Sequence, residues 1–205
     1  MLGLPPSTDI RKQIPKDVFF SSKKIAGKDR SSFDSEVHSM IIRSLISPDS
    51  VNVPAGKDVK TIYVMEVQLN QPFLSPGNIK LLKKMGHKTI YALTHSGKTA
   101  LAVYEKLPFT SKMMQSDTVS ISLIGLDLDE IWENIVRFIA AELSPELPLK
   151  EAIDEFIRIS DLNKKIEALE KKLVKSKQNH EQRELFSQIN KLKKERDKPI
   201  WPRIE

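Results

Sequence analysis

The sequence predicts an α/β (α+β) protein, in which a small mixed sheet flanked by helices is followed by a C-terminal antiparallel helical hairpin. Three observations predict this class. Several segments between residues 59 and 126 are rich in β-branched and aromatic residues and have the two-residue period of strands. Residues 127–143 have the apolar spacing of an amphipathic helix. A helical repeat over residues 162–192 loses its phase halfway, as in a chain that folds back on itself.

The first part of the chain is predicted to contain little regular structure. Residues 1–32 combine prolines with Ser and Lys, which favours an extended N-terminal segment around at most one short helix. The stretch "SFDSEVHSMIIRSLI" follows and stops before Pro48. It predicts a first amphipathic helix at the start of an α/β core domain over residues 33–146, from these residues at helical spacing: Val37, Met40, Ile41, Ser44 and Leu45.

A central strand is predicted in "VKTIYVMEVQLN", residues 59–70, because both of its faces begin apolar and only one turns polar at its end. Pro76 and Gly86 bracket a short helix. Residues 87–94 and 99–107 predict two further strands around a hairpin turn at Gly97, and residues 118–126 predict a half-exposed strand.

The second helical pattern, "DLDEIWENIVRFIAAEL", begins with Asp127 and Glu130 at the spacing of a capping box. Its apolar positions predict a helix packed on the core. The prolines of "SPELPLK" predict a linker to a separate helical hairpin arm and tail, residues 147–205.

The arm is predicted to fold back near Asn179, whose spacing from Gln182 suits a helix cap. Its apolar residues fall into two stripes that lie about 120° apart on one straight helix, so a single partner could not contact both. Folding back places the stripes opposite each other, and a bent single helix that dimerises is the alternative. The predicted seam, which is also the candidate partner-binding set, comprises Leu162, Ile166, Leu169, Leu173, Leu185, Ile189 and Leu192.

Charge is unevenly distributed along the chain, whose formal net charge is +6. Basic residues are concentrated in residues 51–100 and 162–198, and acids in residues 101–150. A basic arm is expected to meet phosphate or an acidic surface. The candidate residues for this contact are Lys171, Lys172, Lys175, Lys177, Lys191, Lys193 and Lys194. The proline-bounded tail that contains Trp201 either packs back on the domain or docks on a partner, and in the second case Trp201 is the candidate anchor.

Composition excludes several kinds of chemistry. With no cysteine, the chain forms no disulfide and has no thiolate nucleophile or ligand. No segment has the length and apolar character of a membrane span or a signal peptide, so a cytoplasmic protein without a membrane contact is expected. The histidines are scattered, and no cofactor or metal site is predicted from their spacing.

One arrangement of polar residues is a candidate catalytic site. Glu66 and Gln68 lie on one face of the predicted central strand, with Asp49 and Asp58 upstream. This pattern resembles the acidic strand of restriction-type nucleases, in which paired carboxylates hold a divalent metal. Gln68 stands where those nucleases have a lysine, so a strand end that faces solvent or a polar partner is the competing interpretation.

Four stretches together carry a resemblance to a known family. They are "LGLPPSTDIRKQIPKDVFF", "SPDSVNVPAGKDVKTIYVMEVQL", "LDLDEIWENIVRFIA" and "LEKKLVKSKQNHEQRELFSQINKLKKE". The chain resembles domain of unknown function family 4391, for which no catalytic residues are established. Genes of that family tend to lie beside helicases and DNA methyltransferases of restriction-like and antiphage systems. The resemblance therefore implies an accessory role in DNA-directed defence. Together with the helical arm, it favours a non-enzymatic accessory subunit that docks on a helicase or DNA methyltransferase. DNA backbone contact by the basic residues of the arm and homodimer formation through the arm are further expectations.

Overall fold

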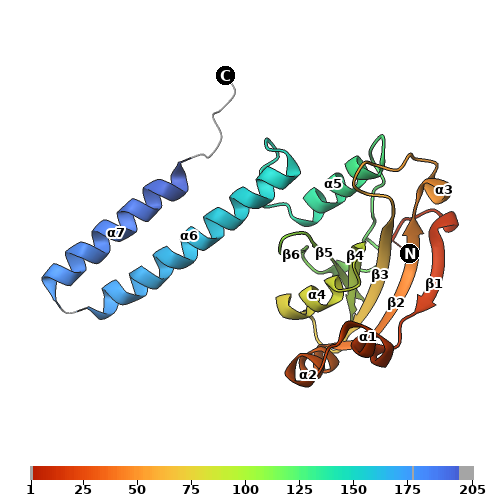
Figure 1. Ribbon diagram of the computed structural model, residues 1–205, viewed down its shortest axis with the longest axis horizontal. Helices are drawn as coiled ribbons and strands as arrows, with labels where there is room; N and C mark the ends of the chain where they lie inside the picture. Colours follow the sequence, from red (N-terminus) through yellow and green to blue (C-terminus); the bar gives the residue numbers. More distant parts are fainter. Residues whose placement is uncertain (1, 177, 199–205) are drawn as a thin grey trace. The chain divides into compact units, whose positions relative to one another are not determined.

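The computed structural model describes residues 2–176 and 178–198 (Figure 1). The chain divides into two compact units, Met1–Glu142 and Leu143–Glu205. The first contains a sheet with its helices, and the second contains a helical hairpin, so the predicted fold class is confirmed. No helix among the described residues combines the length and apolar character needed to cross a lipid bilayer.

A single mixed sheet organises the first unit, and its described strands follow the order β1-β2-β3-β4-β5-β6, with β7 paired to β5. Among the described strands, β3 and β4 pair in parallel and are joined by the crossover helix α4, whereas the other neighbouring pairs are antiparallel. The strands are β1 (Asp9–Gln13), β2 (Val37–Ile46), β3 (Ile62–Leu69), β4 (Lys88–His95), β5 (Lys98–Tyr104), β6 (Pro108–Thr110) and β7 (Met114–Gln115).

Three helices cover one face of the sheet. Phe19, Phe20 and Phe33 from α1 and α2 contact one another and join a core cluster with Ile79 and Leu82 of α4. The helices of this unit are α1 (Lys16–Lys23), α2 (Gly27–Glu36), α3 (Pro48–Val51), α4 (Pro76–Lys83) and α5 (Leu128–Ile139), with a 3-10 turn η1 at Pro6–Thr8.

Alternation along β3 separates the two faces of the sheet. Met65 and Val67 belong to the core cluster under the three helices, whereas Glu66 and Gln68 face the opposite side. The predicted faces of residues 59–70 are therefore confirmed. The predicted helix after Pro76 and the hairpin turn at Gly97, which has a φ of +76°, are also present.

Helix α5 packs against β5. Trp132 donates from Nε1 to Glu105 Oε1 at 2.6 Å, and Lys88 Nζ pairs with the same oxygen at 2.6 Å. Lys88 also lies 5.0 Å from the centre of the Trp132 ring. At the helix start, Asp127 accepts from the backbone N–H of Asp129 and Glu130, while the Glu130 carboxylate accepts from Leu126 N. The predicted helix and its cap residue are confirmed.

The predicted first amphipathic helix is wrong, because α2 ends at Glu36 and the following residues form strand β2. Bulges between Val37 and Ser39 and between Ile42 and Ser44 shift the alternation of β2. Apolar residues from both faces then recur at three- and four-residue intervals and resemble a helical stripe. Pairing with β1 on one side and β3 on the other satisfies the backbone instead.

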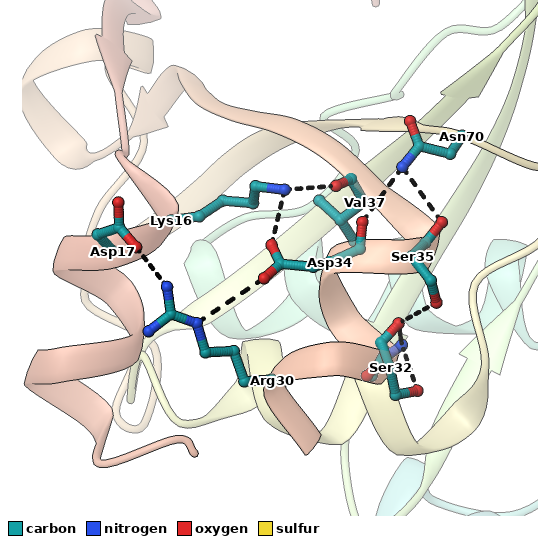
Figure 2. Close-up of polar contacts among 9 residues, drawn as sticks. Lys16, Asp17, Arg30, Ser32, Asp34, Ser35, Val37 and Asn70 are labelled. Atoms are coloured by element: carbon teal, nitrogen blue, oxygen red, sulfur yellow. Dashed lines mark hydrogen bonds and ion pairs between the residues drawn. The ribbon is translucent and has the colours of Figure 1, made fainter. Parts of the chain in front are cut away.

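The first 32 residues are also more regular than predicted, since they contain β1, α1 and the start of α2. Figure 2 shows the polar contacts that hold this region. Lys16 Nζ lies 2.8 Å from Asp34 Oδ1 and donates to Val37 O at 3.0 Å. Arg30 pairs with Asp17 at 2.7 Å, and Asn70 donates to the carbonyls of Asp34 and Ser35. These contacts link helices α1 and α2 to the junction where the chain enters the sheet.

Residues 118–126, predicted as a strand, do not join the sheet. Val119 and Ile121 are buried while Ser120 and Ser122 are exposed, so the predicted alternation of burial is present. The backbone makes no strand ladder there, although Ile121 N donates to Leu2 O. Alternation of apolar and polar residues therefore indicates which side of an extended segment is buried. It does not show that the segment pairs with a strand.

The second unit confirms the predicted antiparallel hairpin, formed by α6 (Leu149–Lys175) and α7 (Asn179–Asp197). The predicted cap is wrong, because Gln178 occupies the N-cap of α7 and makes no side-chain capping bond. Gln182 instead donates from Nε2 to Ser176 O at 2.7 Å, across the turn.

Candidate functional site

A pocket of about 520 Å³ lies on the sheet face opposite α1, α2 and α4. It sits at the carboxyl ends of the parallel strands β3 and β4, and the turn between β4 and β5 borders it. Apolar residues, among them Val64 and Ala92, contribute to its lining. Its polar lining residues are Asp9, Arg11, Arg43, Ser44, Glu66, Gln68, Thr94, His95, Ser96, Thr99 and Ser116.

A carboxylate and a guanidinium are paired within the pocket. Arg43 Nε donates to Glu66 Oε2 at 2.6 Å, although neither side chain is deeply buried. The hydrogen bond to Glu66 raises the pKa of Arg43, against the opposing effect of desolvation, and the charges of Glu66 and Asp9 add to the rise. Arg43 therefore stays cationic beside Glu66, and the two charges largely neutralise each other.

Only part of the predicted nuclease-like set comes together. Glu66 and Gln68 line the pocket, and Gln68 Oε1 accepts a hydrogen bond from Ser39 Oγ at 3.1 Å. Asp49 lies in α3 and Asp58 in the segment before β3, and neither lines the pocket. Over residues 2–176 and 178–198, no three His, Cys, Asp or Glu side chains are grouped so that they could hold a metal ion. The group paired with Glu66 is therefore the Arg43 guanidinium, and neither Asp49 nor Asp58 reaches the pocket.

His95 contributes a defined ring orientation to the pocket. Its Nδ1 lies 3.1 Å from Leu69 O. Since a carbonyl oxygen only accepts, this contact assigns the proton to Nδ1 and leaves Nε2 as an acceptor in the neutral ring.

The seven predicted seam residues lie where the hairpin requires them. Leu162, Ile166, Leu185 and Ile189 are buried, and Leu169, Leu173 and Leu192 are half-buried. They stabilise the contact between α6 and α7, so a partner that docks on the folded hairpin meets its outer faces. Trp201, the candidate anchor, lies outside the described residues.

The predicted basic residues of the arm divide into two groups. Lys171 pairs with Glu167 at 2.6 Å and Lys193 with Glu170 at 2.8 Å, so both take part in contacts within the hairpin. Lys177 lies outside the described residues. The other four are exposed and form no ion pair with the described part of the chain: Lys172, Lys175, Lys191 and Lys194.

The outer face of α7 combines positive charge with an exposed aromatic ring. A groove of about 500 Å³ runs along it, and its lining residues are Arg183, Phe186, Ser187, Asn190, Lys191 and Lys194. These positions recur every three or four residues, so they share one face of the helix, away from the seam residues Leu185 and Ile189. The groove lining contains no acid, and Phe186 is 58% exposed.

Arg183 and Phe186 were not among the predicted site residues. The available signal was their helical phase, because Phe186 directly follows the seam residue Leu185 and so lies about 100° away from it around the helix. An aromatic ring outside the seam and flanked by cations is the pattern that single-stranded nucleic-acid sites use.

The fold and these sites define the chain as an α+β protein with a polar sheet-face pocket and a basic helical hairpin. It belongs to the family described as Domain of unknown function (DUF4391), whose model matches residues 2–195. Neither the comparison with curated proteins nor the comparison with solved structures finds a match.

Proposed function

We propose that the chain is a non-enzymatic accessory subunit that contacts nucleic acid through the outer face of α7. The supporting observation is the groove on α7 whose lining contains Arg183, Lys191 and Lys194 together with the exposed Phe186. When protein cations bind phosphates, counterions condensed on the nucleic acid are released, and this release favours binding. An exposed aromatic ring provides a surface on which a base stacks. The implied setting is a DNA-directed restriction-like or antiphage system, beside a helicase or a DNA methyltransferase.

The hairpin presents this contact surface on a helix that is already folded. Its seam is filled by its own apolar residues, and Lys193 and Glu170 join the two helices at 2.8 Å. The outer face of α7 is therefore presented on a preformed helix, and binding requires little ordering of the backbone.

Charge reversal tests the nucleic-acid contact. The double variant Lys191→Glu/Lys194→Glu removes two of the three cations of the groove, and both residues favour helix, so the hairpin should persist. We expect weaker binding of labelled single- and double-stranded DNA in fluorescence anisotropy. The slope of log K against the logarithm of the salt concentration should become shallower for double-stranded DNA. The expected change is the contribution of about two phosphate contacts, each of which adds roughly 0.9 to the slope.

The matched control is Lys80→Glu/Lys84→Glu on and just after α4, which changes the net charge by the same amount. If it weakens binding as much as the α7 variant does, binding follows overall charge and the assignment to α7 fails. Wild-type binding that does not vary with salt also contradicts the proposal.

Replacing the exposed ring separates stacking from charge. Phe186→Ala leaves the three cations in place, so binding of double-stranded DNA should change little. Binding of single-stranded DNA should weaken by about fivefold to a hundredfold, which corresponds to the loss of one base–aromatic stack. Equal effects on both kinds of DNA would show that Phe186 acts through the hairpin structure and not by stacking.

The partner is tested in the native host with tagged full-length protein and a version truncated after Lys150. Recovery of a helicase or DNA methyltransferase with the full chain, and its loss with the truncated chain, is the expected result. Light scattering on the same two proteins shows whether the arm instead forms a homodimer.

A metal-dependent nuclease centred on Glu66 is the second candidate, favoured by the presence of Glu66, Gln68 and His95 in one pocket. In this case Glu66→Ala abolishes Mg²⁺- or Mn²⁺-dependent cleavage and leaves the fold intact. Wild-type protein that is inert on single- and double-stranded DNA and RNA excludes this candidate.

A further inference from the structure

The sheet-face pocket has the size and the placement of a small-molecule site. Its volume of about 520 Å³ lies within the roughly 300–1,000 Å³ that is usual for ligand pockets. It lies at the carboxyl ends of adjacent parallel strands, where open α/β sheets commonly bind ligands. This location is within the first unit and is independent of the α7 groove.

The apolar part of the lining suits a flat ligand. Val64 and Ala92 project from β3 and β4, which are hydrogen-bonded neighbours, and Leu2 and Leu4 come from the N-terminal segment. The small side chain of Ala92 leaves space above the middle of the sheet. A planar ring can lie against such a surface and bury one of its faces.

The polar part presents a donor and an acceptor side by side. Glu66 Oε2 accepts from Arg43 Nε, whereas Glu66 Oε1 and the terminal nitrogens of Arg43 have no hydrogen-bond partner among the described residues. A ligand edge that carries an N–H next to an acceptor can therefore bond to both side chains at once. Amide-like heterocycles have such an edge.

The charge of the pocket favours a neutral ligand. Arg43 is paired with Glu66 at 2.6 Å, and Arg11 lies 3.4 Å from Asp9, so each cation has a carboxylate beside it. A polyanion would have to compete with both carboxylates, whereas an uncharged heterocycle would not.

We propose that this pocket binds a nucleobase, whose hydrogen-bonding edge meets Glu66 and Arg43 while one ring face lies on Val64 and Ala92. Carboxylate and guanidinium side chains are among the groups that proteins use to recognise base edges. The base can belong to a free nucleoside or to the unpaired end of a strand, since both present the same edge.

Isothermal titration of the full chain with guanosine, adenosine, cytidine and uridine tests the proposal. Saturable binding of at least one nucleoside is expected, with the affinity reduced about tenfold or more by Glu66→Gln and by Arg43→Gln. The control is Glu142→Gln, which makes the same chemical change on an exposed residue outside the pocket. Arg183→Gln in the α7 groove is used for comparison in oligonucleotide binding. Circular dichroism checks that each variant is folded. If Glu66→Gln does not fold, the affinity of Arg43→Gln alone tests the proposal.

Absence of binding for all four nucleosides overturns the proposal, as does unchanged affinity in both pocket variants. A short single-stranded oligonucleotide distinguishes the two sources of the base. If Arg43→Gln and Arg183→Gln both weaken its binding, the pocket takes a base from a strand. If only Arg183→Gln does so while Arg43→Gln weakens nucleoside binding, the ligand is a free nucleoside. Failure of the α7 proposal would leave the nucleoside result intact.

Discussion

At the scale of single residues, Asp129 joins the start of α5 to the segment before β3. Its carboxylate accepts from Lys57 N at 2.6 Å and Val59 N at 2.7 Å, and from Asp58 N at 3.2 Å. Gly56 allows this close approach, because a Cβ at this position would lie 2.6 Å from Asp129 N. Desolvation raises the pKa of Asp129, but the backbone N–H groups of Val59, Asp58 and Lys57, together with Lys60, outweigh it and lower the pKa.

Replacing Asp129 by Ala should lower the free energy of unfolding by about 1–3 kcal/mol, since it leaves backbone donors without their charged acceptor. Because the folded-state pKa is lowered, the ionised form stabilises the fold above the unfolded value of about 3.8, and this stabilisation is lost as the pH falls through the folded value. Chemical denaturation at neutral pH and near pH 3 checks both statements.

The control is Asp117→Ala, on an exposed turn residue of the same type. If Asp129→Ala and the wild type lose the same amount of stability on acidification, the carboxylate of Asp129 is not the group responsible.

At the scale of elements, Arg158 joins α6 to the C-terminal end of α7. Arg158 of α6 donates to the carbonyls of Glu195, Arg196 and Lys198, at distances from 2.8 to 3.2 Å, around the C-terminus of α7. The hydrogen bond to Glu155 raises the pKa of Arg158, against desolvation, and the charges of Glu155 and Glu195 contribute to the rise. A permanent cation thus satisfies carbonyls that a helix end leaves free, and it interacts favourably with the helix dipole.

Arg158→Lys should loosen the last turn of α7, because an ammonium group cannot reach the same set of acceptors as a planar guanidinium. We expect faster hydrogen exchange for backbone amides near Glu195 and Arg196, with a loss of roughly 1 kcal/mol of local stability. Amides near the turn at Ser176 should be unaffected, and Lys165→Ala on the same helix is the matched control. If hydrogen exchange became faster along the whole of α7, Arg158 would stabilise the entire hairpin and not only the last turn of α7.

At the scale of the whole molecule, the two units differ in how they are stabilised. The first has a sheet whose central strands are buried on one face beneath α1, α2 and α4, and it packs α5 against β5. The second has the narrow seam between α6 and α7, supplemented by Arg158 and by the pair of Lys193 and Glu170. A long seam with few buried residues is marginal, so the hairpin should open before the sheet unfolds.

A chain that ends at Glu142 should therefore remain folded and unfold cooperatively, since the sheet, its covering helices and their core lie within the first unit. Thermal unfolding followed by circular dichroism compares it with the full chain. The truncated protein should keep the main transition and lose helical signal only. A truncated chain without a cooperative transition would show that the second unit is needed for the first to fold.

Much of the fold could be predicted because its determinants are local. Alternation in residues 62–69 assigns Met65 and Val67 to one face of β3 and Glu66 to the other, and Asp127 begins α5 as its spacing predicts. The phase break between Leu173 and Leu185 favours the hairpin that the structure shows, since one straight helix would place the two apolar stripes about 120° apart.

Other features depended on contacts between distant segments. Val37–Ile46 became a strand because β1 and β3 flank it, and its bulges hide the two-residue period that would have identified it. Glu66 was found on the correct face, but its neighbour Arg43 comes from the adjacent strand, and Asp49 and Asp58, close to each other in sequence, stayed outside the pocket. The sequence by itself therefore determined the periodicity of β3 and α5, the Asp127 cap and the two apolar stripes of the arm, because these follow from the geometry of one chain segment. Only the tertiary structure decided which strands pair and which charges meet, because strand register brings together residues that no local spacing connects.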